Sequence, residues 1–439
     1  MKRKFLIFIS LVLVMMSVLG ACKDADEIIT NDESNTSDTV IKEGLLVNDI
    51  KITEYTLVYA NSETAVKHFN SKLSQQYQTE LTPTKDFSDG CQIFIGIEAA
   101  YGDVADFYAA CDEGMIGFDG KNVYLLAKDD KGIFSVIDAF FAKATAGDGY
   151  AEISVTQNES VAFTSDNITV MSYNVLYEMY YDDNQEKPRD MADLADFIKE
   201  QNADVFGTQE TLEAHKAAIL SAMPNYDCYE GVVLKGGAKL SNMIFWNADK
   251  FKAVSKGFQY LTDTPYQESK IDESNGYRGF SYVVLESLST KKQFLFVNVH
   301  LTYRDSDGNS GGEAVLQARF KQAQHLVKFL ENKKYEDMPI ILVGDFNSVP
   351  GSAALNAIEN ANRVDRALTV AKTKGDIGST LAKDSHTERD SKYIFDHIFV
   401  TSDRITTEYF TVVDKKINDS GAQRYPSDHL PVLAKIVIC

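Results

Sequence analysis

Polar side chains that could bind a metal or carry a proton follow apolar segments throughout residues 166–439. Those that end such a segment are Asn174, Glu210, His300, Asp345 and Asn347. Side chains alternate along an extended chain, so the Gly-Asp-Phe-Asn motif at 344–347 directs Asp345 and Asn347 to one face. Carboxylate and amide oxygens suit hard divalent cations, and carboxylates and imidazoles transfer protons. We expect these side chains to gather on the rim where the strands end.

Asp396 is the most informative single residue, because it lies within the apolar run at 393–399. A carboxylate among apolar neighbours needs a partner, since an unpaired buried charge is costly. The suitable partner is His429 in the Ser-Asp-His motif at 427–429. An Asp–His pair fixes the tautomer of the imidazole and raises its basicity, and the adjacent Asp428 could reach a cation.

Each of these side chains alone also has an ordinary structural explanation. Asn174 could be a turn residue, Glu210 a solvated strand end, and His300 a structural histidine. The ordered series is more specific: Tyr-Asn, Gln-Glu, Asn-x-His, Gly-Asp-Phe-Asn, Phe-Asp-His-Ile and Ser-Asp-His. With this series, nearly all of residues 166–439 resembles the endonuclease/exonuclease/phosphatase superfamily, the fold shared by DNase I, exonuclease III, bacterial sphingomyelinases and inositol-phosphate 5-phosphatases.

The resemblance implies a fold of the α+β class, a four-layer α/β/β/α sandwich in which two packed sheets lie between helices. It also implies a site for Mg²⁺ or Mn²⁺ held by Asn174, Glu210 and Asp428. The cation would polarise the scissile phosphate and stabilise the leaving oxygen.

The resemblance further implies catalytic roles for five residues. Asp345 would orient or deprotonate the attacking water, while Asn347 and His300 would donate hydrogen bonds to phosphoryl oxygens. His429, paired with Asp396, would complete the phosphate clamp or act as the base.

Two further positions bear on these roles. Arg278 could add a contact to the phosphate, and the segment at 239–242 lacks a carboxylate that many relatives have. Arg278 precedes an apolar run where relatives carry an arginine that faces the phosphate; a plain surface arginine is the alternative. Many relatives also place a carboxylate at the position of the Lys-Leu-Ser-Asn segment at 239–242, where it steadies the equivalent of His300. We expect Asn242 to substitute through a hydrogen bond to His300.

The amino terminus is predicted to be a targeting signal. A basic stretch at 2–4 and an apolar run at 5–19 lead to Leu-Gly-Ala-Cys at 19–22, which resembles the lipobox of bacterial lipoproteins. We therefore expect a signal peptide at 1–22, lipid attachment at Cys22 and a location in the bacterial cell envelope, periplasmic or surface-exposed. A secretory signal with an incidental cysteine is the alternative. Residues 23–44 are acidic and polar, as in a flexible tether.

Residues 45–162 are predicted to form a small α/β domain in the order β-α-β-β-β-α, with helices at 63–76 and 132–142. It resembles the small domain that precedes the barrel in alpha-glucuronidases and beta-hexosaminidases, where it is not catalytic. Residues 166–439 form the predicted catalytic domain. Cys91 and Cys111 are the only cysteine pair worth testing for a disulfide, and free thiols are the simpler expectation.

The composition limits the choice of function. The 439 residues are 44% apolar and 25% charged, which indicates a folded chain, and the net charge is −20. Such a charge disfavours tight, sequence-independent binding to nucleic acids. The sequence therefore predicts an envelope-anchored, monomeric, divalent-metal-dependent phosphoesterase that acts on a glycan, phospholipid, sugar phosphate or nucleic acid. A non-catalytic carbohydrate- or lipid-binding lipoprotein on the same fold is the alternative from another class, and a nuclease is the alternative substrate choice.

Overall fold

The computed structural model describes residues 44–97, 113–147, 149–162, 165–177, 190–231, 241–304, 307, 311–382, 393–419 and 422–438. The predicted signal peptide, Cys22, the tether up to residue 43, and Cys111 lie outside the described residues. Cys91 is a free, half-buried thiol. Among the helices described, none has the length and apolar character needed to cross a membrane.

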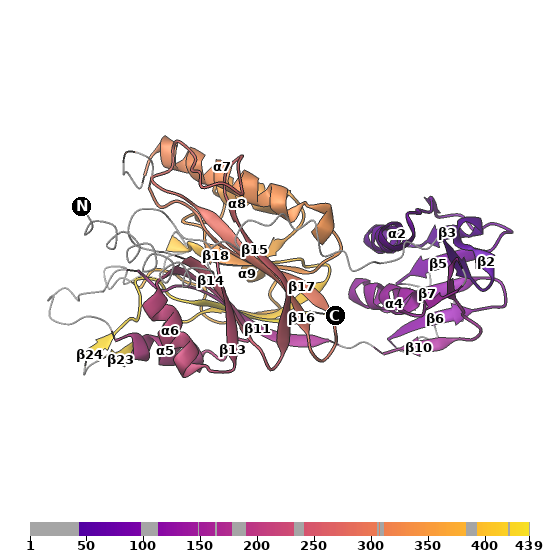
Figure 1. Cartoon of the computed structure of the whole chain (residues 1–439), viewed down its shortest axis with the longest axis horizontal. Helices are drawn as coiled ribbons and strands as arrows, with labels where there is room; N and C mark the ends of the chain where they lie inside the picture. The colour runs from indigo at the N-terminus through magenta and orange to yellow at the C-terminus, as the bar shows by residue number, and fades with distance from the viewer. Residues whose placement is uncertain are drawn as a thin grey trace, which may run out of the picture.

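The smaller unit, at the right of Figure 1, is built on a sheet in the strand order β10-β6-β7-β5-β3-β4. The strands of this sheet are β3 (Thr56–Tyr59), β4 (Pro83–Thr84), β5 (Gln92–Gly96), β6 (Gly114–Phe118), β7 (Val123–Ala127) and β10 (Glu159–Val161). A second sheet contains β1 (Leu45–Val47), β2 (Ile50–Lys51), β8 (Thr145–Ala146) and β9 (Ala151–Ile153). Helices α2 (Glu63–Tyr77) and α4 (Asp130–Ala142) pack against each other and share one apolar core with both sheets.

Both helices of this unit begin where the sequence provides a cap. The side chains of Ser62 and Asp129 accept hydrogen bonds from the first-turn amides of α2 and α4. The two predicted helices and the four predicted strands are present, and the strands of two or three residues were not predicted. Such strands are too short to show a period-2 pattern.

The larger unit contains two packed sheets. The first has the order β13-β14-β12-β11-β25-β22-β20. Its strands are β11 (Asp166–Asn174), β12 (Val205–Thr211), β13 (Tyr226–Glu230), β14 (Ser241–Asn247), β20 (Thr373–Lys374), β22 (Ile405–Val412) and β25 (Val432–Ile438). The second has the order β15-β16-β17-β18-β21-β19. Its strands are β15 (Phe251–Tyr260), β16 (Gly279–Ser287), β17 (Gln293–His300), β18 (Ile340–Asp345), β19 (Asp365–Arg366) and β21 (Asp396–Val400).

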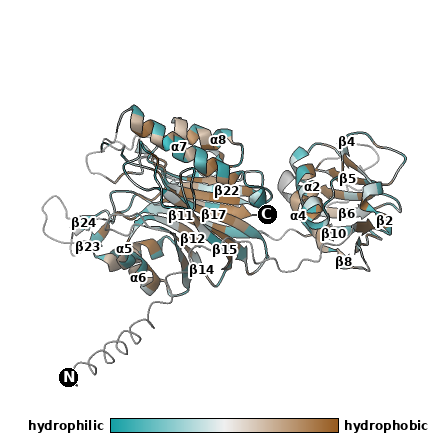
Figure 2. Cartoon of the chain, turned by 45° about the horizontal axis from the view of Figure 1, so that its top comes forward, coloured by the Kyte–Doolittle hydropathy of each residue, from teal (hydrophilic) through white to brown (hydrophobic). Residues whose placement is uncertain are grey.

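Helices cover the outer faces of the two sheets. Helices α7 (Glu313–Leu330) and α8 (Ala353–Asn360) pack on the second sheet, and α5 (Met191–Glu200) and α6 (Glu213–Ala222) pack on the first. A third cluster of apolar side chains fills the space between the sheets. In Figure 2 the strands are mainly brown, whereas the helices carry both teal and brown residues. The predicted four-layer α/β/β/α sandwich preceded by a small α/β domain is confirmed. Short elements complete the unit: α9 (Ala367–Val370), the 3-10 turn Lys333–Tyr335, and the hairpin of β23 (Ile417–Asp419) and β24 (Ala422–Arg424).

A buried polar bridge joins the two sheets. Asn298 of β17 is 0% exposed, and its Nδ2 donates to the carbonyl oxygens of Thr208 and Met243 in the other sheet, at 2.9 and 2.8 Å. Its Oδ1 accepts from Gln209 Nε2 at 2.7 Å. A side chain on Gly207 would come within 2.7 Å of Asn298 Cγ, so glycine leaves the space that this bridge needs. Asn298 and Gln209, part of the motif series, therefore hold the sheets in register.

The two units meet at a cluster of charged side chains around the buried His68 of α2. His68 is 2% exposed; its Nε2 lies 2.8 Å from Asp138 Oδ1, and its Nδ1 lies 3.5 Å from Asp337 Oδ1 of the larger unit. Arg404 lies 3.6 Å from Asp337, and its guanidinium stacks 4.5 Å from the ring centroid of Phe134 in α4. Burial opposes ionisation of both carboxyls, but the hydrogen bonds and positive charge at His68 outweigh it and lower the pKa of Asp138 and Asp337.

We expect Asn298→Ala to lower the free energy of unfolding by about 2–4 kcal/mol, because it leaves buried polar groups of the opposite sheet without their hydrogen-bond partner. Urea denaturation measures this value. Asn356→Ala, at an exposed position on α8, is the matched control and should change it by less than about 0.5 kcal/mol. Equal effects of the two substitutions would contradict the bridging role of Asn298.

The charged cluster predicts a dependence of stability on pH. The pKa of Asp337 is lower in the folded protein, so its contribution is present above the unfolded pKa, near 4, and is lost as pH falls through the folded pKa. Asp337→Asn should lower the free energy of unfolding by about 1–2 kcal/mol at pH 7 and by much less at pH 3. Asp86→Asn, at an exposed site, should show no such difference; a pH-independent loss in Asp337→Asn would refute the expectation.

Candidate active site

The register of the strands brings the predicted residues to one rim of the sandwich. β11 and β12 are parallel with Asn174 opposite Gln209, and β17 and β18 are parallel with His300 opposite Asp345. β21 runs antiparallel to β18 and begins with Asp396 opposite Asp345. Strand ends that are far apart in sequence therefore meet at the same edge of the two sheets.

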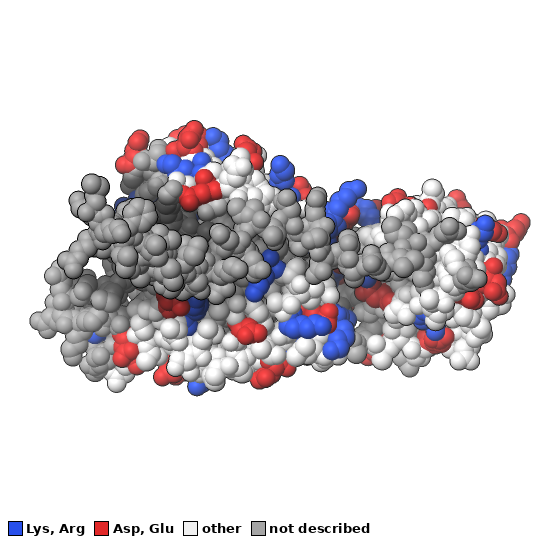
Figure 3. All heavy atoms as spheres, viewed as in Figure 1, with Lys and Arg blue, Asp and Glu red and all other residues white. Residues whose placement is uncertain are grey.

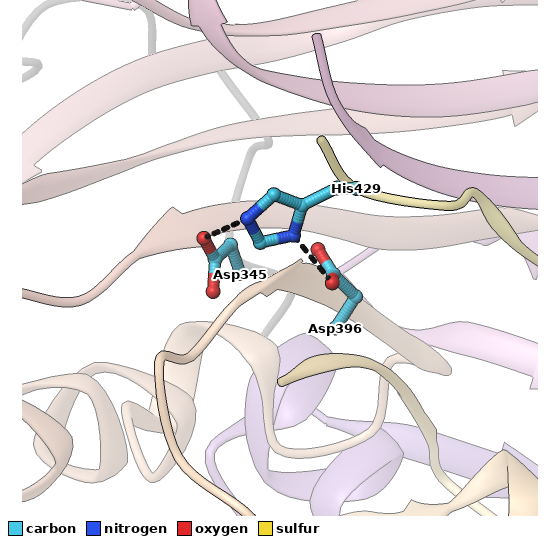
Figure 4. Close-up of side chains that lie close together, drawn as sticks. All are labelled: Asp345, Asp396 and His429. Carbon is cyan, nitrogen blue, oxygen red and sulfur yellow. Dashed lines mark hydrogen bonds and ion pairs between the residues drawn. The ribbon is translucent and has the colours of Figure 1, made fainter. Parts of the chain in front are cut away.

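Asp345, Asp396 and His429 form the centre of this rim (Figure 4). His429 Nδ1 lies 2.8 Å from Asp396 Oδ2, and His429 Nε2 points toward Asp345 Oδ2 at 3.8 Å. Asp396 is 0% exposed, and its Oδ1 has no hydrogen-bond partner among the described residues. The sequence argument that the carboxylate at 396 requires the ring at 429 agrees with this geometry. The three side chains offer ligand atoms within 4.8 Å of one another, close enough to hold an ion.

The buried charges in this centre shift one another's titration. Burial opposes charge on His429, but the negative charges of Asp396 and Asp345 and the hydrogen bond that its ring donates to Asp396 raise its pKa well above the usual value. Burial raises the pKa of Asp345 to about 7, with His429 opposing the shift and Asp396 adding to it. The two carboxylates therefore favour the protonated form of His429, which suits it to bind phosphoryl oxygens.

The predicted metal ligands lie beside this centre. Asn174 Nδ2 donates to Glu210 Oε1 at 3.3 Å and to Asp345 Oδ2 at 3.1 Å. The Ser427 hydroxyl donates to the carbonyl oxygen of Asn174 at 2.7 Å and lies 3.4 Å from Asp428 Oδ1. Glu210 and Asp428 are partly exposed, unlike the buried Asp345. This set of carboxylate and amide oxygens at an accessible rim has the chemistry of a Mg²⁺ or Mn²⁺ site.

Two of the site residues have left-handed backbone conformations. Glu210 has φ 58° and Asn347 has φ 47°. Such values are uncommon for residues other than glycine, and they persist only where the surroundings enforce them. The amide of Tyr177 donates to Glu210 Oε2 at 3.2 Å, and the amide of Asn347 donates to Asp345 Oδ1 at 2.8 Å. The backbone at both positions therefore contributes to placing the functional groups.

His300 has a different partner from the one expected. Asn242 Nδ2 donates to the carbonyl oxygen of Gly279 at 2.8 Å, so the predicted hydrogen bond from Asn242 to His300 is wrong. Instead, Arg278 Nη1 lies 3.4 Å from His300 Nδ1, and Asn347 Nδ2 lies 3.2 Å from His300 Nε2. Burial and the positive charges of Arg278 and His429 lower the pKa of His300 well below its usual value. The unprotonated form of the His300 ring is therefore favoured.

Helix α7 positions two loops, the one that carries Arg278 and the one that follows His300. Arg319 Nε donates to the carbonyl oxygen of Thr302 at 2.8 Å, and Gln322 Oε1 accepts from the amide of Thr302 at 2.9 Å. Gln322 Nε2 donates to the Ser274 hydroxyl at 3.3 Å, which ties the loop before Arg278 to the same helix. The sequence analysis missed both residues. A signal was available, since Arg319 and Gln322 are polar at three-residue spacing among the apolar positions of a helix.

Thr380 is a second positioning residue that the sequence analysis missed. Its hydroxyl oxygen accepts from the amides of Phe395 and Asp396 at 3.0 and 3.3 Å. Its carbonyl oxygen accepts from the amide of Leu430 at 2.6 Å. Thr380 therefore links the segment of Asp396 to that of His429. No local sequence pattern marks such a contact, because it depends on three distant segments.

The comparison with known protein families agrees with the resemblance noted in the sequence. The model of the Endonuclease/Exonuclease/phosphatase family matches residues 171–429. None of the curated protein sequences matches the chain significantly.

Solved structures share the sandwich. An endonuclease/exonuclease/phosphatase family protein from Bacteroides thetaiotaomicron is 24% identical, with a TM-score of 0.56, covering 63% of this chain and 100% of that chain. A mannosyl-6-phosphatase from the same organism is 24% identical, with a TM-score of 0.53, covering 61% and 99%. A family protein from Bacteroides vulgatus is 20% identical, with a TM-score of 0.53, covering 62% and 100%. These likenesses concern the fold, and the family model adds the sequence pattern from strand β11 to His429. The chain belongs to the endonuclease/exonuclease/phosphatase family.

Proposed function

We propose that the protein is a divalent-metal-dependent phosphoester hydrolase. The observation that carries the proposal is the convergence, on one rim, of an oxygen-rich ligand set with the pair of His429 and Asp396. Hydrolysis of phosphate esters is the general chemistry of this family. One fold neighbour is described as a mannosyl-6-phosphatase, which supports a phosphate ester of a sugar among the candidate substrates.

The proposed cation is Mg²⁺ or Mn²⁺. Asn174, Glu210 and Asp428 would hold it, since all three offer oxygen atoms and none is a soft ligand; Glu210 and Asp428 are partly exposed, whereas Asn174 is buried. When bound, the cation would polarise the phosphate and stabilise negative charge on the leaving oxygen. The buried group of Asp345, Asp396 and His429 is less suited to this task, because His429 Nδ1 is already engaged by Asp396.

The protein side chains supply the rest of the proposed chemistry. Asp345 lies between the two imidazoles, 3.5 Å from His300 Nε2 and 3.8 Å from His429 Nε2. From this position its carboxylate orients the attacking water and accepts its proton. His429 donates from Nε2 to a phosphoryl oxygen, and Asp396 fixes the orientation of its ring. His300 at the end of β17 and Asn347 just after β18 also contact the phosphate.

Nucleic acid is the less favoured substrate. The chain carries a net charge of −20, and acidic and basic side chains are interspersed over the face shown in Figure 3. Tight binding to single strands normally uses a continuous basic groove with aromatic platforms. The alternative of a non-catalytic carbohydrate- or lipid-binding protein is disfavoured. Burying the ion pair of His429 and Asp396 costs desolvation energy, and a site without catalytic activity gains nothing from keeping it.

The cellular setting is also a proposal. The basic stretch, apolar run and Leu-Gly-Ala-Cys sequence at the amino terminus support a lipoprotein anchored through Cys22 to the cell envelope, with the hydrolase carried as a monomer on a tether. Sugar phosphates, phospholipid head groups and phosphorylated glycans are the substrates available there.

We expect Asp345→Asn, Asp428→Asn and His429→Gln each to lower kcat/KM for a phosphate ester at least about 100-fold in the presence of Mg²⁺ or Mn²⁺. Asp249→Asn and His325→Gln are the matched controls, at an exposed turn and on the outer side of α7, and should retain activity. Circular dichroism confirms that each variant folds.

Chelation completes this test. Excess EDTA should abolish activity, and added Mg²⁺ or Mn²⁺ should restore it. Full activity in EDTA, or full activity in all three site variants, would exclude the proposed function. Calorimetric titration with Mn²⁺ distinguishes the binding-protein alternative, which predicts no metal binding near millimolar concentration.

The anchor has its own test. Cys22→Ser should move the protein from the membrane fraction to the soluble fraction when the full chain is expressed in a bacterium with a lipoprotein pathway. Labelling with a clickable fatty acid should mark the wild-type chain and leave Cys22→Ser unlabelled. Labelling of both chains would contradict attachment at Cys22.

A further inference from the structure

We propose that the cleft between the two units binds a compact ligand that carries two or more phosphate groups. The cleft has a volume of about 670 Å³, which is in the range of small-molecule sites. Helices α2 and α4 form its wall on the smaller unit, and the turn before β17 and the segment before β18 form its wall on the larger unit. A ligand held here would contact both units.

The cleft lies at the end of the sandwich opposite the candidate active site. Gln293 lines the cleft and begins β17, whereas His300 ends that strand. Pro339 lines the cleft just before β18, whereas Asp345 ends that strand. At ~3.4 Å per residue, the length of β17 places the cleft roughly 24 Å from His300. The ligand would therefore bind apart from the phosphate that the rim hydrolyses, and the inference does not rest on the proposed function.

The lining of the cleft carries an excess of positive charge. Against two carboxylates, the lining residues that the structure describes include the positive side chains Lys72, Lys291, Lys292, Lys334 and Arg404. The chain as a whole has a net charge of −20, so this concentration runs against its composition. Figure 3 shows blue side chains on the part of the larger unit that faces the smaller one. Like charges gathered at an interface repel one another, and an anion between them removes the repulsion.

The two carboxylates and the arginine of the lining join the walls of the cleft. Asp138 Oδ1 lies 2.8 Å from His68 Nε2 and 3.0 Å from Lys72 Nζ, all within the smaller unit. Asp337 Oδ1 of the larger unit lies 3.5 Å from His68 Nδ1 and 3.6 Å from Arg404 Nη2. These contacts hold the two walls together before a ligand arrives, so little conformational entropy is lost on binding.

The residue types of the cleft favour phosphate over carboxylate. The planar fork of an arginine matches a carboxylate, but the fork of Arg404 is already engaged between the units. A lysine ammonium acts as a point charge with rotatable donors, which suits the tetrahedral arrangement of phosphate oxygens. Lys72 comes from α2 and Lys291 from the turn between β16 and β17, so each wall offers a charge to a separate phosphate. Phe134 and Met338 add apolar surface for the carbon framework between the phosphates.

Calorimetry with inositol hexakisphosphate in EDTA tests this inference on the purified protein. EDTA removes the divalent cations that both the probe and the candidate active site would bind. We expect the Kd to rise at least about tenfold in Lys72→Gln and in Lys291→Gln, because each loses one charge from one wall. The matched controls are Lys67→Gln, exposed on the same helix as Lys72, and Lys374→Gln, exposed on β20. Both should stay within about twofold of wild type, since neither residue lines the cleft.

Vesicles distinguish a lipid head group from a soluble source of the phosphates. The vesicles are phosphatidylcholine with or without cardiolipin, whose head group holds two phosphates, and the chain carries Cys22→Ser so that no lipid anchor contributes. Sedimentation with cardiolipin that is lost in Lys291→Gln would identify a lipid head group. Binding of the soluble probe alone would identify a soluble phosphorylated ligand, and either result supports the site.

Two results would overturn the inference. One is that neither the soluble probe nor the cardiolipin vesicles bind. The other is that all four lysine substitutions weaken binding equally, which would show attraction to the general surface and no site in the cleft. Neither result depends on turnover, so the hydrolase proposed for the rim would stand or fall separately.

Discussion

The buried charge of Asp396 is the constraint on which the site depends. Asp396 begins β21 of one sheet, whereas His429 lies just before β25 of the other. Their 2.8 Å contact therefore crosses the sandwich, and it is the partner of a carboxylate that is 0% exposed. Separating the sheets would leave that charge unpaired at a cost of several kcal/mol, on the order of 3–5. The geometry of the candidate catalytic pair and the packing of the fold are thus one requirement.

A second polar contact prevents the sheets from shifting past each other. Asn298 bonds to two carbonyl oxygens and to Gln209 in the opposite sheet. Apolar packing between sheets is not directional, so it tolerates small displacements. Hydrogen bonds at fixed positions do not, and a displacement of 1 Å is enough to spoil a catalytic geometry. Asn298 and the pair of Asp396 and His429 together fix the rim to which the metal ligands belong.

Much of this arrangement could be predicted from sequence, and the failures have a common cause. Helices α2 and α4 begin and end within two residues of the predicted bounds at 63–76 and 132–142, and the strands that end in Asn174, His300 and Asp345 are found as expected. Partners of buried polar groups were predicted only where chemistry leaves one choice, as for Asp396. Where several donors could serve, as at His300, the wrong one was chosen, because the side chain of Asn242 is equally able to bond to the carbonyl oxygen of Gly279. Thr380 was missed because its contacts exist only after distant segments meet. Arg319 and Gln322 were missed although their polar side chains at buried positions of α7 gave a signal.

The loop before β16 brings Arg278 to the rim without altering a strand. Arg278 immediately precedes Gly279, where strand β16 begins, and its Nη1 lies 3.4 Å from His300 Nδ1. A side chain added to Gly279 would come within 2.2 Å of the Phe258 ring and within 2.6 Å of the carbonyl oxygen of Gln259. The close approach of β15 and β16 at this glycine therefore fixes where the loop ends and, with it, the position of Arg278 beside His300.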